Sequence, residues 1–267
     1  MSIKIDLTGK TAAIIGAGRG IGKAVAITLA KAGANVWLGS RSENQSKAVV
    51  QQIKDMGCNA GYSVIDVSNF DDVQRFLDEA ENFADGNVDI VVNNAGILET
   101  APFLDTSVEQ IKTLFGINII GASNVLQCAI KKMMPNKSGK IILTTSFAGQ
   151  KGLPTWSHYC ASKAAAISLM QSGAGIGAQY NINVNSVAPG IIRTDMWESI
   201  LDGLELDEGS EGKSKDEMFD SFIESFIPLN RPQTEQDIAN ATLFLASDLA
   251  NEITGQTINV DGGAVMH

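Results

Sequence analysis

Short runs of apolar, β-branched residues alternate with longer helical stretches along the 267-residue chain. Several of these runs are continuously apolar, which is typical of strands covered on both faces. We expect strands at 11–15, 35–39, 62–66, 88–92, 140–145, 182–187 and 256–260, and helices at 20–32, 43–56, 69–84, 107–134, 157–179 and 234–246. The alternation predicts an α/β fold with one doubly wound parallel sheet and helices on both faces. No linker or repeat interrupts it, so we expect a single domain over 1–267.

Composition and charge exclude several classes of protein. The net charge is −10 and no basic patch is present, which argues against nucleic acid as a partner. No run of about 18 apolar residues suggests a membrane span, and MSIKIDLTGK lacks the features of a secretory signal. The three cysteines are an odd number without a CxxC pair, and free thiols are typical of a cytoplasmic protein. Two histidines argue against a zinc site, so we expect no metal.

A glycine-rich segment, GAGRGIG at 16–22, connects the first expected strand to the first expected helix. Gly16 permits a tight turn, and Gly20 and Gly22 let the backbone approach a pyrophosphate at the helix N-terminus. A glycine-rich turn alone is weak, because such turns are often only turns. The strand before it and the helix after it favour a dinucleotide site.

The second expected strand ends in Ser40 followed by Arg41. A fold that reads NAD places an acidic residue here to hold the ribose 2′-hydroxyl, whereas a hydroxyl and a guanidinium would bind a 2′-phosphate. Arg19 of the glycine loop could close on the same phosphate. The alternative is two solvated surface arginines. We therefore expect NADP(H), with NAD(H) as the less favoured cofactor.

Tyr159 and Lys163 lie four residues apart in a helical stretch, SHYCASKAAA. Residues i and i+4 share a helix face, so the lysine ammonium could reach toward the phenol. A nearby cation favours phenolate, which would make the tyrosine a usable acid and base near neutral pH. Such a pair also occurs by chance, so the spacing alone does not establish catalysis.

Further motifs follow in order: Asp66 after the third strand, NNAG at 93–96, Asn118, Ser146 and a Pro–Gly pair at 189–190. Together with GAGRGIG and YxxxK, they resemble the short-chain dehydrogenase/reductase family over residues 6–263. The resemblance implies a Rossmann-type fold and hydride transfer with a nicotinamide cofactor. It implies that Tyr159 is the general acid/base, that Lys163 lowers the pKa of Tyr159 and binds the ribose, that Ser146 polarises the carbonyl, and that Asn118 holds a water in a proton relay.

The resemblance also implies which residues contact the cofactor, with Asp66 at the adenine. The expected set is Gly16, Arg19, Gly20, Ile21, Gly22, Ser40, Arg41, Asp66, Val67, Asn94, Ala95, Gly96, Tyr159, Lys163, Pro189, Gly190, Ile192 and Thr194. Family members associate through the helices expected at 107–134 and 157–179, which implies a homodimer or homotetramer. Because Gly173 and Gly177 share a face of the second helix, we expect a close helix crossing in that interface.

An acidic segment after the sixth strand bears on the substrate. Residues 195–224 carry eleven acidic residues against two lysines, a local charge of −9. We expect two short amphipathic helices around a mobile loop at 202–214, forming a lid over 195–227. This charge would disfavour an acidic acyl carrier, which favours a small neutral alcohol or ketone of polyol, sugar-alcohol or diol type. The alternatives are a 3-oxoacyl-thioester reductase of fatty-acid type and a non-catalytic NADP(H)-binding regulatory protein.

Overall fold

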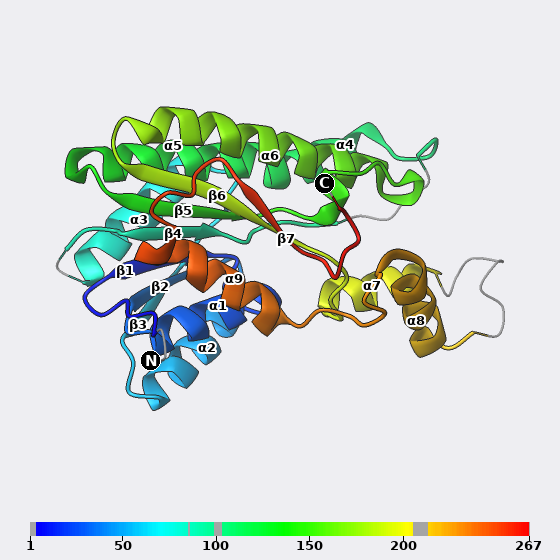
Figure 1. The fold of residues 1–267 in the computed structure, drawn as a ribbon, viewed down its shortest axis with the longest axis horizontal. Helices are drawn as coiled ribbons and strands as arrows, with labels where there is room; N and C mark the ends of the chain where they lie inside the picture. The colour runs from blue at the N-terminus through cyan, green and yellow to red at the C-terminus, as the bar shows by residue number, and fades with distance from the viewer. Residues whose placement is uncertain (1–3, 85, 99–102, 205–212, 267) are drawn as a thin grey trace.

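A parallel sheet of seven strands forms the centre of the computed structural model, which describes residues 4–84, 86–98, 103–204 and 213–266 (Figure 1). The strand order is β3-β2-β1-β4-β5-β6-β7, and every neighbouring pair is parallel. The strands are β1 (Thr11–Ile15), β2 (Asn35–Ser40), β3 (Ala60–Val64), β4 (Ile90–Asn93), β5 (Gly139–Thr144), β6 (Ile182–Pro189) and β7 (Thr257–Val260). The order reverses between β1 and β4, which confirms the predicted doubly wound, Rossmann-type fold.

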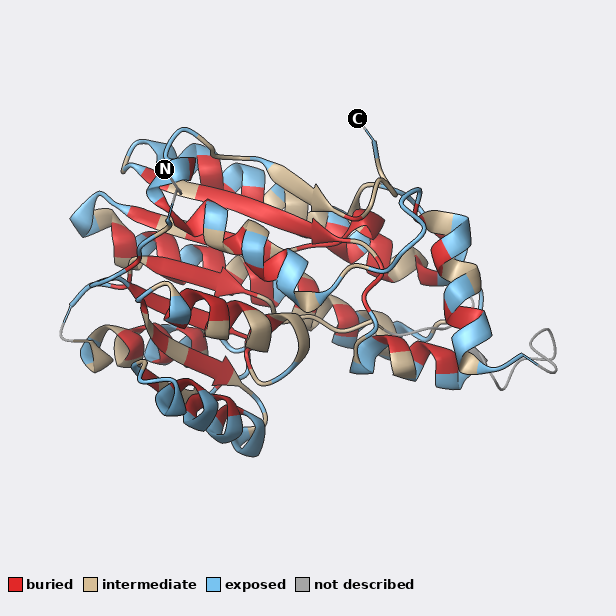
Figure 2. Cartoon of the chain, turned by 60° about the horizontal axis from the view of Figure 1, so that its bottom comes forward, coloured by how far each residue is buried: buried red, intermediate tan, exposed pale blue. Residues whose placement is uncertain are grey.

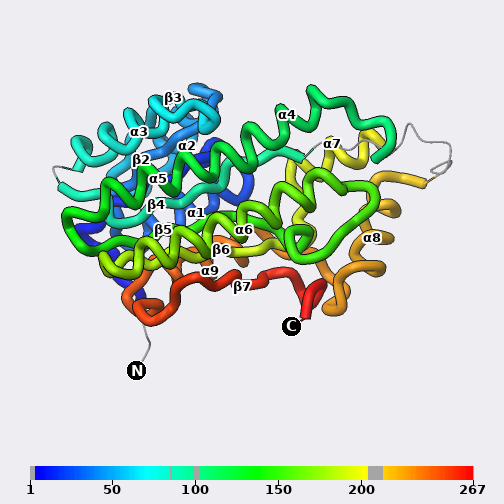
Figure 3. The backbone as a smooth tube through the Cα atoms, turned by 90° about the horizontal axis from the view of Figure 1, so that it is seen from above, coloured from blue at the N-terminus to red at the C-terminus, as the bar shows by residue number. Residues whose placement is uncertain are grey.

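Helices cover both faces of the sheet (Figures 1 and 3). One layer contains α1 (Gly20–Lys31), α2 (Glu43–Asp55) and α9 (Glu235–Ala246); the other contains α3 (Phe70–Phe83), α5 (Gly121–Met133) and α6 (Ser157–Ala178). Alternate side chains of β1 point to opposite faces of the sheet: Ile14 packs against the first helix layer and Ile15 against the second. Nearly all side chains of the central strands are therefore buried (Figure 2).

The helix expected at 107–134 is divided into three parts in the structure. It consists of α4 (Val108–Phe115), a π-helical turn at Gly116–Ile120 and α5. π-Helical turns are rare, and those that do occur often lie at functional sites. This one carries Asn118. The stretch Val108–Asn136 is long and apolar enough to cross a membrane by length and composition, but 56% of its most apolar window is buried inside the fold. Its apolar side chains thus have a packing role against α3 and α6.

Two helices after β6 form a separate projection at the carboxyl end of the sheet (Figure 1). They are α7 (Asp195–Leu204) and α8 (Lys215–Phe226), which confirms the two short helices predicted for the lid. Ser214 begins α8 with a capping box, because its hydroxyl accepts from Glu217 N while the Glu217 carboxylate accepts from Ser214 N. Most of the loop predicted to be mobile, at 202–214, lies outside the described residues.

The prediction for the glycines of α6 is wrong. Gly173 faces the interior of its own chain, where an added Cβ would lie 3.3 Å from Leu126 of α5. An added Cβ at Gly177 would lie 3.0 Å from the carbonyl oxygen of Ile182. Both glycines therefore let α6 approach α5 and β6 within one chain, and the crossing they permit is intramolecular.

Candidate active site

A cavity of about 1200 Å³ opens at the carboxyl ends of the strands, beside the point where β1 and β4 diverge. Ligands bind at this position in doubly wound folds. Every site residue predicted from the sequence lines the cavity except Gly22 and Asn118. Residues from 16 to 236 in the sequence thus surround one space.

Glycine packing shapes the phosphate end of this cavity. Gly16 has a positive φ of 78°, and Gly22 packs so closely that an added Cβ would lie 2.0 Å from the Gly16 carbonyl oxygen. The side chain of Asn94 donates from Nδ2 to the same oxygen at 3.2 Å. Gly22 is thus a packing residue that brings α1 against the loop, which explains why it does not line the cavity.

The first turn of α1 fits a cofactor pyrophosphate. Its N-cap residue, Arg19, makes no side-chain capping bond, and the turn contains no acidic residue. Gly20 has a φ of 52°, and the nearest atom to an added Cβ is Thr194 Cγ2 at 3.9 Å. A side chain at Gly20 would therefore fill open cavity in front of the helix N-terminus, where backbone N–H groups attract an anion.

Arg41 lies on the cavity wall, at the end where the ribose is expected, as predicted. The neighbouring side chains, however, have other partners than the sequence suggested. Ser40 donates its only hydroxyl proton to the Ser42 carbonyl oxygen at 2.9 Å, so it stabilises the turn after β2 and has no proton left for a phosphate. Arg19 forms an ion pair with Asp195 at 2.9 Å, instead of turning toward Arg41. Both corrections come from local partners that the sequence order does not reveal.

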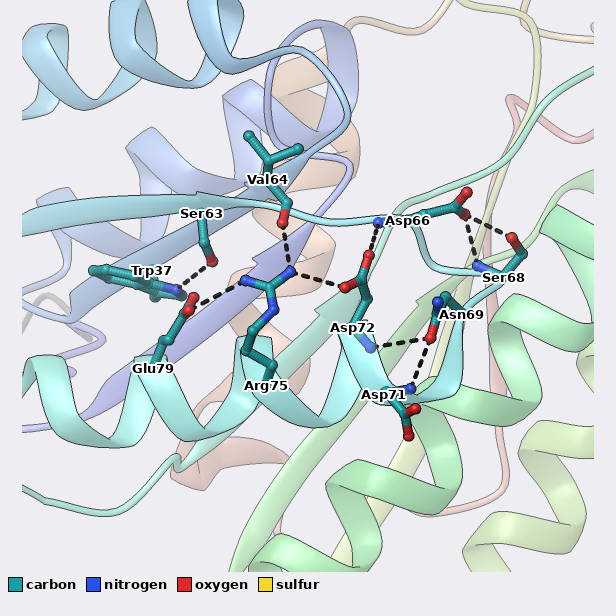
Figure 4. A network of polar contacts seen from close by, with 10 residues as sticks. All are labelled: Trp37, Ser63, Val64, Asp66, Ser68, Asn69, Asp71, Asp72, Arg75 and Glu79. Carbon is teal, nitrogen blue, oxygen red and sulfur yellow. Dashed lines mark hydrogen bonds and ion pairs between the residues drawn. The ribbon is translucent and has the colours of Figure 1, made fainter.

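A polar network fixes the loop that follows β3 (Figure 4). Asp66 accepts from the backbone N–H and hydroxyl of Ser68, at 2.9 and 2.7 Å. Asn69 caps α3 by accepting from two amides of its first turn. Arg75 donates to the Val64 carbonyl oxygen at 3.0 Å and pairs with Asp72. The loop therefore holds Asp66 at the cavity edge, in a position compatible with its predicted contact to the adenine.

Ser146, Tyr159 and Lys163 lie together deeper in the cavity, and all three are buried. The Ser146 side chain lies close enough to the phenol of Tyr159 to lower its pKa. The Lys163 Nζ lies 5.6 Å from the centre of the Tyr159 ring and donates to the Thr144 carbonyl oxygen at 3.0 Å. Their grouping brings a hydroxyl donor, a phenol and an amine around one point.

Burial controls the proton affinities of these groups. It raises the pKa of Tyr159 to about 12, and the Ser146 hydrogen bond opposes this rise only in part. Burial also lowers the pKa of Lys163 to about 8. The net shift of the Tyr159 pKa in the cofactor-free protein is therefore upward, opposite to the expected lowering, because desolvation of the phenolate is its largest cause.

Asn118 lies behind the catalytic group and is buried. Its Oδ1 accepts from Ile97 N at 2.9 Å, while its Nδ2 donates to the Ile97 carbonyl oxygen and to Ser162 Oγ. Ser162 in turn donates to the Tyr159 carbonyl oxygen at 2.7 Å. The amide of Asn118 thus ties the strand edge to the helix that carries Tyr159, and both of its N–H groups are used.

Four residues with a place in this site were not predicted from the sequence. Thr144 accepts from Lys163, and Ser162 connects Asn118 to Tyr159. The other two are Trp156 and Trp197, which line the cavity beside Ser146 and Tyr159. Ser162 and Trp156 lie within three residues of Tyr159, so proximity in sequence could have indicated them. Nothing in the sequence indicates Thr144, whereas Trp197 falls within the lid predicted over 195–227.

This fold and site define an oxidoreductase that uses a dinucleotide cofactor. The family described as Enoyl-(Acyl carrier protein) reductase matches residues 16–265. The 3-oxoacyl-[acyl-carrier-protein] reductases FabG of Staphylococcus epidermidis and Rickettsia felis are 37% and 36% identical to the chain, covering 96% and 98% of it and 99% of each relative. A short-chain type dehydrogenase/reductase from Mycobacterium marinum superposes with a TM-score of 0.88 at 34% identity, over 98% of both chains. The chain belongs to the short-chain dehydrogenase/reductase family and is an NAD(P)-dependent enzyme.

The same relatives overturn the predicted preference for a small neutral polyol, diol or ketone. Relatives that align with the chain over nearly their full length are named 3-oxoacyl-[acyl-carrier-protein] reductases. These names fit the alternative stated in the sequence analysis, a 3-oxoacyl-thioester reductase of fatty-acid type. The acidic lid misled the prediction, because part of its charge is balanced locally. Asp202 pairs with Lys215, and Arg193 pairs with both Glu198 and Asp216. The local charge of −9 already includes Lys215, but it leaves out Arg193, which precedes the counted segment, and it cannot show which charges lie in contact.

Proposed function

We propose that this protein reduces the 3-oxo group of an acyl thioester to a 3-hydroxyl group with NADPH. The observation that carries the proposal is the convergence of Ser146, Tyr159 and Lys163 on one cavity in a chain whose full-length relatives are named 3-oxoacyl reductases. The whole chain would act as one catalytic domain in the cytoplasm, with residues 195–227 as its lid.

The reacting carbonyl oxygen would lie between the hydroxyls of Ser146 and Tyr159. Reduced nicotinamide, when bound, supplies the hydride that attacks the carbonyl carbon. The Ser146 hydroxyl stabilises the negative charge that grows on the oxygen, and Tyr159 donates the proton that completes the alcohol. The carbonyl double bond is thereby reduced, with one hydride on carbon and one proton on oxygen.

The proton affinity of Tyr159 suits its role as the proton donor in the reduction. With a pKa of about 12, the phenol is protonated at neutral pH and ready to donate. Dehydrogenation would need the phenolate, which burial disfavours. Lys163, with its pKa at about 8, is largely protonated at neutral pH and can hold the ribose hydroxyls and help to restore the proton. Asn118 fixes the backbone around this group.

NADPH is favoured over NADH by the charge at the end of β2. This strand ends at Ser40 without an acidic side chain, and the exposed guanidinium of Arg41 lines the cavity next to it. Arg19 also lines the cavity and would join Arg41 on a 2′-phosphate after leaving Asp195. The Arg41→Ala variant is expected to lose its preference for NADPH, and a retained preference would refute this assignment.

We also propose that the protein forms a homodimer or homotetramer through the helices at 107–134 and 157–179. Ile120 of the π-helical turn and Ile176 of α6 are each 54% exposed in the single chain. Sedimentation of wild type beside an Ile120→Glu, Ile176→Glu variant tests this, and unchanged assembly of the variant would exclude these helices as the interface.

The central experiment compares substrates and cofactors. NADPH and NADH oxidation should be followed with acetoacetyl-CoA, a 3-oxoacyl group on acyl carrier protein, and a polyol with NADP⁺ as the contrast. Tyr159→Phe is expected to lower thioester reduction by about 10²- to 10⁴-fold while NADPH still changes the tryptophan fluorescence. An enzyme that binds NADPH but reduces no 3-oxoacyl thioester would refute the proposed function.

A further inference from the structure

An aromatic cluster joins the segment between β5 and α6 (residues 145–156), here called the catalytic loop, to the lid helices α7 and α8. Trp197 of α7 contacts Trp156 edge to face, with ring centres 5.5 Å apart and an angle of 84°. Phe222 of α8 packs against both tryptophans, at 6.2 Å from Trp156 and 5.3 Å from Trp197. Buried segments of both lid helices are visible in Figure 2. The full cluster is Phe147, Trp156, Trp197, Phe219, Phe222 and Phe226.

Only part of this cluster faces the cavity. Phe147, Trp156 and Trp197 line it together with Ser146 and Tyr159, although the two tryptophans are only 5% and 7% exposed. Trp156 ends the short 3₁₀ turn Pro154–Trp156, which leads directly into the helix that carries Tyr159. The two indoles therefore form a wall beside the position of the reacting carbonyl, supported from behind by Phe222.

The direction of the substrate follows from its size. A 3-oxoacyl thioester has two arms at the reacting carbon, the thioester arm and the acyl tail. The nucleotide part of coenzyme A and the fold of a carrier protein are too bulky to lie beside the reacting carbonyl, so the thioester arm must lead out through the open mouth. With the carbonyl oxygen at Ser146 and Tyr159, the tail then points inward, toward Trp156 and Trp197.

We propose that Trp156 and Trp197 determine specificity by limiting the length of the acyl tail, so that the enzyme prefers short 3-oxoacyl thioesters of the acetoacetyl type. This inference rests on the proposed function. Each methylene that finds an open apolar pocket strengthens binding by about four-fold. A methylene that must displace packed rings instead weakens binding by about five-fold or more, since Trp156 and Trp197 are fixed by their aromatic neighbours.

The test measures kcat/KM with NADPH for acetoacetyl-, 3-oxohexanoyl- and 3-oxooctanoyl-CoA. The readout is the ratio of the longest to the shortest substrate within one variant, which is independent of the fraction of folded enzyme. Wild type should prefer acetoacetyl-CoA by at least about ten-fold, and Trp197→Ala should raise the ratio at least about ten-fold, as expected when two or more methylenes gain room. Phe219→Leu is the matched control, because Phe219 contacts Trp197 at 5.7 Å but does not line the cavity.

Trp156→Leu and Trp197→Leu serve as milder variants, and both should shift the ratio in the same direction. The inference is overturned if wild type reduces the longest substrate as well as the shortest, or if replacing either tryptophan leaves the ratio unchanged. It is also overturned if Phe219→Leu shifts the ratio as strongly as Trp197→Ala, since general loosening of the lid would then be the cause. Absence of turnover with every thioester would instead refute the proposed function.

Discussion

Replacing Lys163 with methionine is expected to stabilise the cofactor-free fold while removing activity. Burial lowers the pKa of Lys163 from 10.5 to about 8, which corresponds to a cost of roughly 3 kcal/mol for keeping this lysine charged in the folded protein. Methionine has a similar length and carries no charge, so it avoids that cost. The substitution also removes the hydrogen bond from Lys163 to the Thr144 carbonyl oxygen, and this loss reduces the gain in stability by about 1 kcal/mol. The net gain at pH 7 is about 2 kcal/mol.

The stability that Lys163→Met gains over the wild type is expected to shrink as the pH rises. Below pH 8 both the folded and the unfolded wild type hold the proton of Lys163, so the full cost is present. Between about pH 8 and 10.5 the folded state loses this proton first, and the unfolded state binds more protons. The wild type therefore becomes more stable relative to Lys163→Met by up to about 1.4 kcal/mol per pH unit. Tyr159, raised to a pKa of about 12, is present in both proteins and leaves the difference unchanged.

Urea unfolding without cofactor, followed by circular dichroism at several pH values from 7 to 10, measures this difference. Lys54→Met is the matched control, because Lys54 is exposed in the last turn of α2, and it should change stability by less than about 0.5 kcal/mol at every pH. If Lys163→Met is no more stable than wild type at pH 7, or if its advantage does not shrink toward pH 10, the lysine is not desolvated as argued here.

Three further experiments test separate parts of the structure. Asp195→Asn releases Arg19 from an exposed ion pair, so NADPH should bind about two- to five-fold more tightly in a fluorescence titration; unchanged affinity would contradict this competition. Gly175→Ala should raise the free energy of unfolding by about 1 kcal/mol, because the added Cβ meets open space. Gly177→Ala should give no such gain, because its Cβ would crowd the Ile182 carbonyl oxygen. Equal gains in the two variants would contradict this packing. Ser162→Ala should cost about 1–3 kcal/mol in urea unfolding by leaving a buried amide unpaired, and a neutral result would contradict its role.

Much of the fold could be predicted from the sequence because its signals are local. A buried parallel strand is a short apolar run, and TAAII at 11–15 is β1 to the residue. Where the apolar run has less distinct ends, the predicted bounds differ from the observed ones. The third strand was expected at 62–66 and is found at 60–64. The π-helical turn within 107–134 was not predicted, because its sequence GINII contains weak helix formers that do not distinguish a π-helical turn from an α-helical one.

The candidate site was predictable in its members but not in their partners. Motif spacing placed Tyr159 and Arg19 at the cavity, because chain order fixes which strand end they follow. It could not predict that Arg19 pairs with Asp195, which is 176 residues away in the chain. The direction of the pKa shift of Tyr159 was likewise missed, because a neighbouring lysine is visible in the sequence whereas the loss of water is not.

That loss of water connects the lid to the chemistry. Tyr159 belongs to the same buried cluster as Trp197 of α7 and Phe219 of α8. Packing of the lid on the catalytic loop therefore contributes to the burial that raises the pKa of Tyr159. Opening of the lid would return water to the phenol and move its pKa back toward its ordinary value of 10. In the proposed function, the packed helices α7 and α8 would therefore do more than exclude solvent, because they would keep the proton on Tyr159 until a carbonyl oxygen that is gaining negative charge becomes the stronger base.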